Sequence, residues 1–123
     1  HTDDSIRACV DDFSSLFPGG GSLLFGCAAD KAAGAMAESL RSAFTEVVIT
    51  RPGTFKESDT AALERTFIEH GFEVRRIDDT AEAVRTAIDG AIAAGLPLLV
   101  TGSFYLCAYA AAELEARRAR HQA

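Results

Sequence analysis

The chain has few of the residues that mark specialised protein classes. Its 123 residues include no tryptophan, one methionine, three prolines and three cysteines. Cys9, Cys27 and Cys107 are odd in number, lack C-x-x-C spacing and each lie in an apolar stretch, so we expect buried free thiols in a reducing compartment, without a disulfide or a metal site. No apolar run approaches the roughly 20 residues that cross a bilayer, and no signal segment opens the chain, which predicts a cytoplasmic protein without membrane contact.

Positive charge is also scarce. The formal net charge is -6 at pH 7 and the pI is about 4.9, which argues against broad binding to nucleic acid or anionic lipid but leaves room for a small anionic ligand at a local cation. The basic run Arg117–Arg120 is expected to be the solvated end of a helix, where the dipole favours positive charge. The composition, 48% apolar and 24% charged, predicts one compact domain over residues 1–123.

Hydrophobic periodicity predicts helices and strands in alternation. Short apolar runs indicate buried strands, and apolar residues at i, i+3, i+4 and i+7 indicate helices between them. The strands are expected at residues 23–27, 46–50, 72–77 and 98–101. The helix after the third strand is expected to begin at the capping box of Asp79 and Glu82. The order αβαβαβαβα predicts an α/β fold with a three-layer, doubly wound, mainly parallel sheet, Rossmann-like, with about four strands and helices on both faces.

Particular residues are assigned to the core and to the sheet edge by the same patterns. Phe17 is expected to close the buried stripe of the first helix, and Ile92 and Leu114 are expected to face inward from the last two helices. The strand at residues 72–77 is polar and is expected at an edge. The first and last strands are the most apolar and are expected as central neighbours.

The turn Thr101-Gly102-Ser103 joins the last strand to the last helix. Open α/β sheets bind ligands beyond the carboxyl ends of their strands, so this turn and the loop after the first strand would flank a crevice. Two interpretations of Ser103 stay open, because a serine here either contacts a ligand or only caps the helix. Lys31 and Arg51 are equally open, since each is either a fixed cation for a carboxylate or a solvated loop residue.

Familiar nucleotide and hydrolase motifs are missing. Neither G-x-G-x-x-G nor G-x-x-x-x-G-K-[ST] occurs, and the glycine run at residues 19–21 precedes a strand instead of following one, so the chain is not expected to cradle nucleotide phosphates in the usual way. Ser103 lacks the G-x-S-x-G elbow, and His1, His70 and His121 lie at chain or helix ends, which disfavours a serine hydrolase. A receiver-like signalling domain would need a lysine after the last strand, where this chain has Thr-Gly-Ser.

Three segments contain recognisable motifs: residues 1–13, Leu24-Phe25-Gly26 with Ala29-Asp30-Lys31, and residues 100–106, Val-Thr-Gly-Ser-Phe-Tyr-Leu. The first resembles the stretch that begins at the histidine of D-x-A-H-[NT], the second F-G-x-x-x-D-K and the third V-T-G-S-[LF]-[YH]-L. These are motifs of the folylpolyglutamate synthases, which the chain therefore resembles and whose C-terminal domain shares its fold with the Mur ligases. The motifs come in the right order. The resemblance covers essentially the whole chain, but only the C-terminal, glutamate-ligase domain of that family.

The resemblance implies an ATP-dependent amide ligase as the parent protein. In that family ATP phosphorylates the carboxylate of a folate or dihydropteroate, and the amino group of L-glutamate attacks the acyl phosphate. This domain would help to seat glutamate and would close over ATP and Mg held mainly by a preceding ATPase domain. His1 corresponds to the motif histidine near nucleotide and glutamate, Lys31 to a cation for the glutamate carboxylate, and Ser103, with Tyr105 in the same motif, to the glutamate-binding segment.

The chain departs from the family pattern at its start. The motif aspartate, the strand before it, and the phosphate loop and metal-binding residues of the larger domain are not in this sequence. We therefore expect the isolated domain to be inactive as a ligase, and the strand at residues 98–101 to have an exposed edge. The alternative function is a non-catalytic small-ligand-binding or interaction module of the same α/β fold.

Overall fold

The computed structural model describes residues 3–29, 32–53 and 58–122. Helices and strands alternate as the periodicity predicts. In chain order they are α1 (Asp3–Leu16), β1 (Ser22–Phe25), α2 (Ala33–Arg41), β2 (Glu46–Ile49), α3 (Thr60–Glu69), β3 (Glu73–Arg76), α4 (Thr80–Ala94), β4 (Leu98–Thr101) and α5 (Phe104–Gln122). Among these described residues, no helix is long and apolar enough to cross a membrane.

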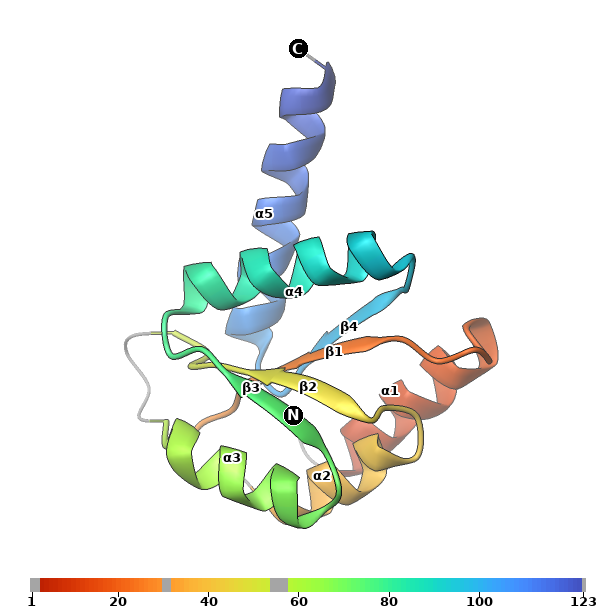
Figure 1. Cartoon of the computed structure of the whole chain (residues 1–123), viewed down its shortest axis with the longest axis vertical. Coiled ribbons are helices and arrows are strands. Elements are labelled where there is room, and N and C mark those ends of the chain that lie inside the picture. Colours follow the sequence, from red (N-terminus) through yellow and green to blue (C-terminus); the bar gives the residue numbers. More distant parts are fainter. Residues whose placement is uncertain (1–2, 30–31, 54–57, 123) are drawn as a thin grey trace.

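The four strands form one parallel sheet in the order β3-β2-β1-β4. Leu24 in β1 lies opposite Val48 in β2 and Val100 in β4. Helices α1, α2 and α3 cover one face of the sheet and α4 and α5 cover the other (Figure 1). The three-layer, doubly wound, parallel architecture expected from the sequence is therefore confirmed.

Each face of the sheet has its own apolar core. On the side of α1, α2 and α3, the ring of Phe67 packs between Phe25 and Phe72, with ring centroids 4.9 and 5.0 Å apart. The rings are tilted, as aromatic pairs prefer. On the other side, Leu24 and Leu106 are completely buried. Because β1 is covered on both faces, its continuous apolar run is explained.

The two outer strands of the sheet differ in polarity. β3 exposes Glu73, Arg75 and Arg76 at one edge, as predicted, and such charges discourage pairing with another strand. β4 lies at the opposite edge and is only half-buried from Leu98 to Val100. β1 and β4 are neighbours, as expected, but β4 is the outermost strand of the described sheet instead of a central one. The exposed edge expected for this strand is present.

Several apolar residues expected in the core are exposed. Phe17 is 43% exposed, Ile92 68% and Leu114 51%. Phe17 lies beyond the last residue of α1, and the centroid of its ring lies 5.0 Å from that of the Phe13 ring. Leu114 belongs to the second half of α5, which projects past α4 (Figure 1). Ile92 lies at the flank of the inward stripe of α4, one position beyond the buried Ala91.

The cysteines also differ from expectation. Cys27 is buried as predicted, whereas Cys9 and Cys107 are half-buried. Burial raises the pKa of both half-buried thiols; a nearby Asp12 adds to the effect at Cys9, and Cys9 adds to it at Cys107. The thiols of both residues therefore ionise at higher pH than ordinary cysteines do.

Arg117 is more than the solvated end of a helix. Its Nη1 donates to Oδ1 of Asp89 in α4 at 2.6 Å, and its Nε lies 3.5 Å from Oε2 of Glu113. The hydrogen bond to Asp89 raises the pKa of the guanidinium above its ordinary value. Arg118 and Arg120 are exposed, as expected for the basic run. Arg117 thus connects the projecting half of α5 to α4.

Candidate functional site

The carboxyl ends of β1, β2 and β4 converge so closely that only glycine fits at two positions. A Cβ at Gly102 would lie 2.5 Å from the carbonyl oxygen of Gly26, and a Cβ at Gly26 would lie 2.6 Å from that of Thr50. Gly102 also has a φ of +102°, which side chains disfavour. The N–H of Gly26 donates to the carbonyl oxygen of Thr101 at 3.3 Å, and the N–H of Thr50 donates to the carbonyl oxygen of Phe25 at 3.1 Å. This backbone junction fixes the loops that leave it.

Ser103 follows the junction directly and begins α5. Its Oγ accepts a hydrogen bond from the N–H of Tyr105 at 3.1 Å, and its carbonyl oxygen accepts one from the N–H of Cys107 at 3.1 Å. The expected helix cap is therefore confirmed. A serine hydroxyl that accepts in this way still has a proton to donate, so the cap is compatible with a ligand contact. Tyr105, the next predicted site residue, is 51% exposed beside it.

The loop after β1 emerges at the same edge as Ser103, because Phe25 and Thr101 are partners in parallel strands. The Oγ of Ser58 donates to the carbonyl oxygen of Cys27 at 2.9 Å and ties this loop to the segment before α3. The predicted residues Lys31 and His1 lie outside the described residues. The structure therefore brings Ser103 and Tyr105 together and places the start of the Lys31 loop beside them.

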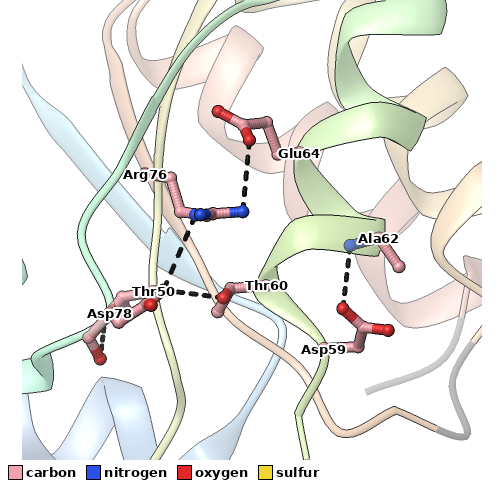
Figure 2. Close-up of polar contacts among 7 residues, drawn as sticks. All are labelled: Thr50, Asp59, Thr60, Ala62, Glu64, Arg76 and Asp78. Atoms are coloured by element: carbon pink, nitrogen blue, oxygen red, sulfur yellow. Dashed lines mark hydrogen bonds and ion pairs between the residues drawn. The ribbon is translucent and has the colours of Figure 1, made fainter.

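The ends of β2 and β3 form a polar cluster (Figure 2). The Oγ1 of Thr60 donates to Oδ1 of Asp78 at 2.6 Å, and the Oγ1 of Thr50 donates to the carbonyl oxygen of Asp78 at 3.5 Å. The Nη1 of Arg76 lies 3.3 Å from Oε1 of Glu64, and its Nε lies 3.8 Å from Oδ1 of Asp78. The sequence reasoning missed this cluster, for which the only local signal is an arginine and an aspartate at the end of a strand.

The helix N-termini along this edge differ in charge. Asp59 caps α3 by accepting from the N–H of Ala62 at 2.9 Å, and Asp79 caps α4 by accepting from the N–H of Glu82 at 2.8 Å. By contrast, the N-cap residues of α2 and α5 are neutral: Ala32 makes no side-chain bond, and Ser103 caps α5 with its hydroxyl. Helix N-termini favour anions. The chain's own carboxylates serve two of these termini, so the edge between α2 and α5 suits an external anion best.

Arg51 lies at the end of β2, on the acid-capped side of this edge. Its carbonyl oxygen accepts a hydrogen bond from the Oγ1 of Thr80 at 2.8 Å, which fixes the main chain, while the side chain is exposed. Within residues 3–29, 32–53 and 58–122, no three His, Cys, Asp or Glu side chains are grouped to hold a metal ion. The described part of the chain therefore does not fit a magnesium site of its own.

A hollow of about 610 Å³ lies at the opposite end of the strands, beneath α4. Its lining includes Glu46, Glu73 and Gly90, and neither of the described site residues, Ser103 and Tyr105. In open parallel sheets the ligand crevice lies outside the carboxyl ends of the strands. The turn at Ser103, and not this hollow, is therefore the candidate functional site.

Fold and site geometry together define an α/β domain with a candidate site at the carboxyl ends of β1 and β4, between α2 and α5, whose described N-cap residues, Ala32 and Ser103, are neutral. The family model described as Mur ligase, glutamate ligase domain, matches residues 1–104. The chain belongs to this family of Mur ligase glutamate-ligase domains. A search of curated protein sequences finds no match.

Solved structures of folylpolyglutamate synthases share the fold. The enzyme from Thermotoga maritima has a TM-score of 0.76 and 22% identity, over 89% of this chain and 25% of that one. The Mycobacterium tuberculosis enzyme complexed with ADP has a TM-score of 0.72 and 24% identity, over 93% and 28%. E. coli FolC in complex with DHPP and ADP has a TM-score of 0.75 and 20% identity, over 96% and 28%. This chain thus spans only about a quarter of the length of these relatives.

Proposed function

We propose that this domain is the C-terminal part of an ATP-dependent ligase that adds L-glutamate to the carboxylate of a folate or dihydropteroate. The observation that carries the proposal is the turn Val-Thr-Gly-Ser-Phe-Tyr-Leu in a chain of the Mur ligase family. This turn lies at the half of the candidate edge whose described helix caps are neutral. The relatives from M. tuberculosis and E. coli were solved with ADP, and FolC also with DHPP.

Glutamate is proposed to bind between the loop after β1 and the start of α5. The ammonium of Lys31 pairs with a carboxylate of glutamate, and the hydroxyl of Ser103 donates a hydrogen bond to the same carboxylate. Tyr105 lies at the edge of this proposed site. Backbone N–H groups at the N-terminus of α5 favour the same anion. The glutamate nitrogen then attacks, as the neutral amine, the carbonyl carbon of the acyl phosphate. The C–N bond forms, the bond from that carbon to the phosphate oxygen breaks, phosphate leaves with the bonding electron pair, and the nitrogen loses a proton to solvent. Holding one substrate in place supplies part of the rate enhancement through orientation.

The nucleotide is proposed to be held mainly by a preceding ATPase domain of the parent enzyme, with His1 reaching it from this domain. ATP with Mg supplies the phosphoryl group that activates the folate carboxylate. This sequence has no G-x-x-x-x-G-K-[ST] phosphate loop. The 123-residue chain alone should therefore form no ADP when given ATP, folate and glutamate. Glutamate-dependent ADP formation by the purified chain that is lost in Ser103→Ala would contradict this part of the proposal.

Steady-state kinetics of the parent enzyme test the glutamate site. Lys31→Ala should raise the glutamate KM roughly ten- to hundredfold, the loss of a charge-assisted contact of about 1.5–3 kcal/mol, with the ATP KM nearly unchanged. Arg118→Ala removes an exposed cation near the far end of α5 and serves as the matched control. A Lys31→Ala enzyme with the wild-type glutamate KM would exclude Lys31 from the site. An equal rise in both KM values for Ser103→Ala would leave Ser103 as a helix cap only.

A further inference from the structure

The first half of α5 has an exposed side without charge. Residues 104–112 contain no Asp, Glu, Lys or Arg, whereas charged residues recur from Glu113 onward. Phe104 is 78% exposed, Tyr105 51% and Tyr109 44%. The alanines between them on this side of the helix are exposed too. We define the α5 face as these residues: Phe104, Tyr105, Ala108, Tyr109 and Ala112.

The composition of the α5 face is not required by the fold. Leu106 and Ala110 already anchor the helix in the core, since both are buried, and an exposed helix surface is normally polar. The exposed Ile68 is followed by the charged Glu69, and the exposed pair Leu16 and Phe17 follows two serines and lies at the end of a helix. Adjacent exposed aromatic residues are typical of protein interfaces, where tyrosine and phenylalanine are enriched.

We infer that the α5 face is the docking surface for the larger part of the same polypeptide, which carries the ATP site in the proposed parent enzyme. This inference rests on the proposed function. Two observations select this occupant. The solved relatives have about three quarters of their length outside the region matched by this chain. The α5 face also begins next to Ser103, so a domain that brings ATP to that turn meets Phe104 and Tyr105 first.

The chemistry of the partner surface follows from the α5 face itself. Aromatic rings and alanine methyl groups call for apolar contacts, and the hydroxyl of Tyr109 needs one polar group at the rim of the contact. Docking on α5 also keeps the helix start at a fixed angle to the partner. Apolar closure around Ser103 would exclude water from the reacting groups.

Fluorine NMR tests the docking directly, because Tyr105 and Tyr109 are the two tyrosines of the whole sequence. The 123-residue chain labelled with 3-fluorotyrosine gives two signals, and Tyr109→Phe assigns them. The unlabelled remainder of the encoded polypeptide, produced separately, is then titrated in. The Tyr109 signal should shift and saturate with that addition. An unmoved Tyr109 signal at saturating partner, or no association by calorimetry, overturns the inference.

Matched variants show whether the α5 face supplies the affinity. Tyr109→Arg should weaken the association at least roughly tenfold and Tyr109→Phe by less than about threefold. Ile92→Arg alters an exposed apolar residue of α4 outside the α5 face and should have no effect. Circular dichroism checks that each variant folds. Association of Tyr109→Arg as tight as that of the wild type overturns the inference.

Two further outcomes separate this inference from its alternatives. A Tyr109 shift that depends on the concentration of the labelled chain alone assigns the α5 face to a second copy and overturns docking of the same polypeptide. Glutamate-dependent ADP formation by the full-length enzyme is measured in parallel. An active enzyme with an unmoved Tyr109 signal would leave the proposed function standing while the docking inference fails, and docking without ligase activity would show the reverse.

Discussion

The ligand edge of the sheet has two unlike halves. Where β2 and β3 end, Asp59 and Asp79 cap the next helices and Asp78 accepts from Thr60, so the chain's own carboxylates satisfy the local donors. Where β1 and β4 end, two glycine backbones meet and Ser103 caps α5 with a neutral hydroxyl. The described helix caps of the first half carry negative charge, whereas those of the second half, Ala32 and Ser103, are neutral. A neutral cap leaves the positive end of the helix dipole uncompensated by the cap itself.

This difference shows what decides the location of a site in a parallel sheet. The topology already distinguishes one junction, because in the order β3-β2-β1-β4 the switch point lies between β1 and β4. The cap residues act in the same direction, because an aspartate occupies the place of an anionic ligand and a serine does not. The predictions below alter one half of the edge at a time.

The largest effect is expected where β1 and β4 touch. Gly102→Ala should destabilise the domain by about 3 kcal/mol or more, since φ is +102° and a Cβ would lie 2.5 Å from a carbonyl oxygen. Gly90→Ala is the control, because nothing lies within 4 Å of a Cβ there. This control should stabilise α4 by about 0.5–1 kcal/mol. Urea unfolding measures both, and a Gly102→Ala domain as stable as the wild type would disprove the close contact.

Ser103→Asp converts the cap of α5 into the kind that α3 and α4 have. Asp and Ser cap helices about equally well, so the free energy of unfolding should change by less than about 0.5 kcal/mol. The new carboxylate would occupy the proposed anion position, and the affinity of the parent enzyme for glutamate should fall by roughly a hundredfold, about 2.7 kcal/mol. Asp79→Ser makes the reverse exchange at α4 and should leave the glutamate KM unchanged. A normal glutamate KM in Ser103→Asp would remove the start of α5 from the site.

A smaller effect is expected in the half of the edge that the chain satisfies itself. Thr60→Val removes the hydroxyl that donates to Asp78 at 2.6 Å and keeps the side-chain shape. Because Asp78 is partly exposed to water, the loss should be about 1 kcal/mol in urea unfolding. Thr60→Ser keeps the donor and should restore most of the stability. Neither change should affect glutamate binding, and a raised glutamate KM in Thr60→Val would extend the site across the whole edge.

Local features were predictable from the sequence and long-range ones were not. The caps at Asp79 and Ser103 each join residues two or three positions apart, so the local sequence pattern was sufficient to predict them. The Thr60–Asp78 contact joins residues 18 positions apart, and no periodicity reports such a pair. The position of β4 at the edge depends on how all strands pair, which a single apolar run does not specify.

The exposure of Leu114 has a similar origin. It depends on how α5 crosses α4, a tertiary arrangement in which Arg117 meets Asp89 from 28 positions away. For the site, the turn at Ser103 could be found from sequence because a strand, a glycine and a helix cap follow one another. The roles of Lys31 and His1 come from the family resemblance, and both residues lie outside the described parts of the chain.

The smallest predicted effect is a pH dependence from the half-buried thiols. Burial raises the pKa of Cys9 and Cys107 above the ordinary value of 9.0, so the unfolded chain loses these protons first as pH rises. Their contribution to stability is complete below about pH 8 and is lost as pH rises through the folded-state pKa values. The urea midpoint should therefore fall above pH 9 by slightly more in the wild type than in a Cys9→Ala, Cys107→Ala double variant. The two proteins differ only at these two cysteines, so the difference between their profiles isolates the thiols. Parallel pH profiles would show that the thiols ionise equally in folded and unfolded chains. The Cys107 thiol, which donates to the carbonyl oxygen of Val100 in β4 at 3.2 Å, would then be as accessible to water in the folded domain as in the unfolded chain.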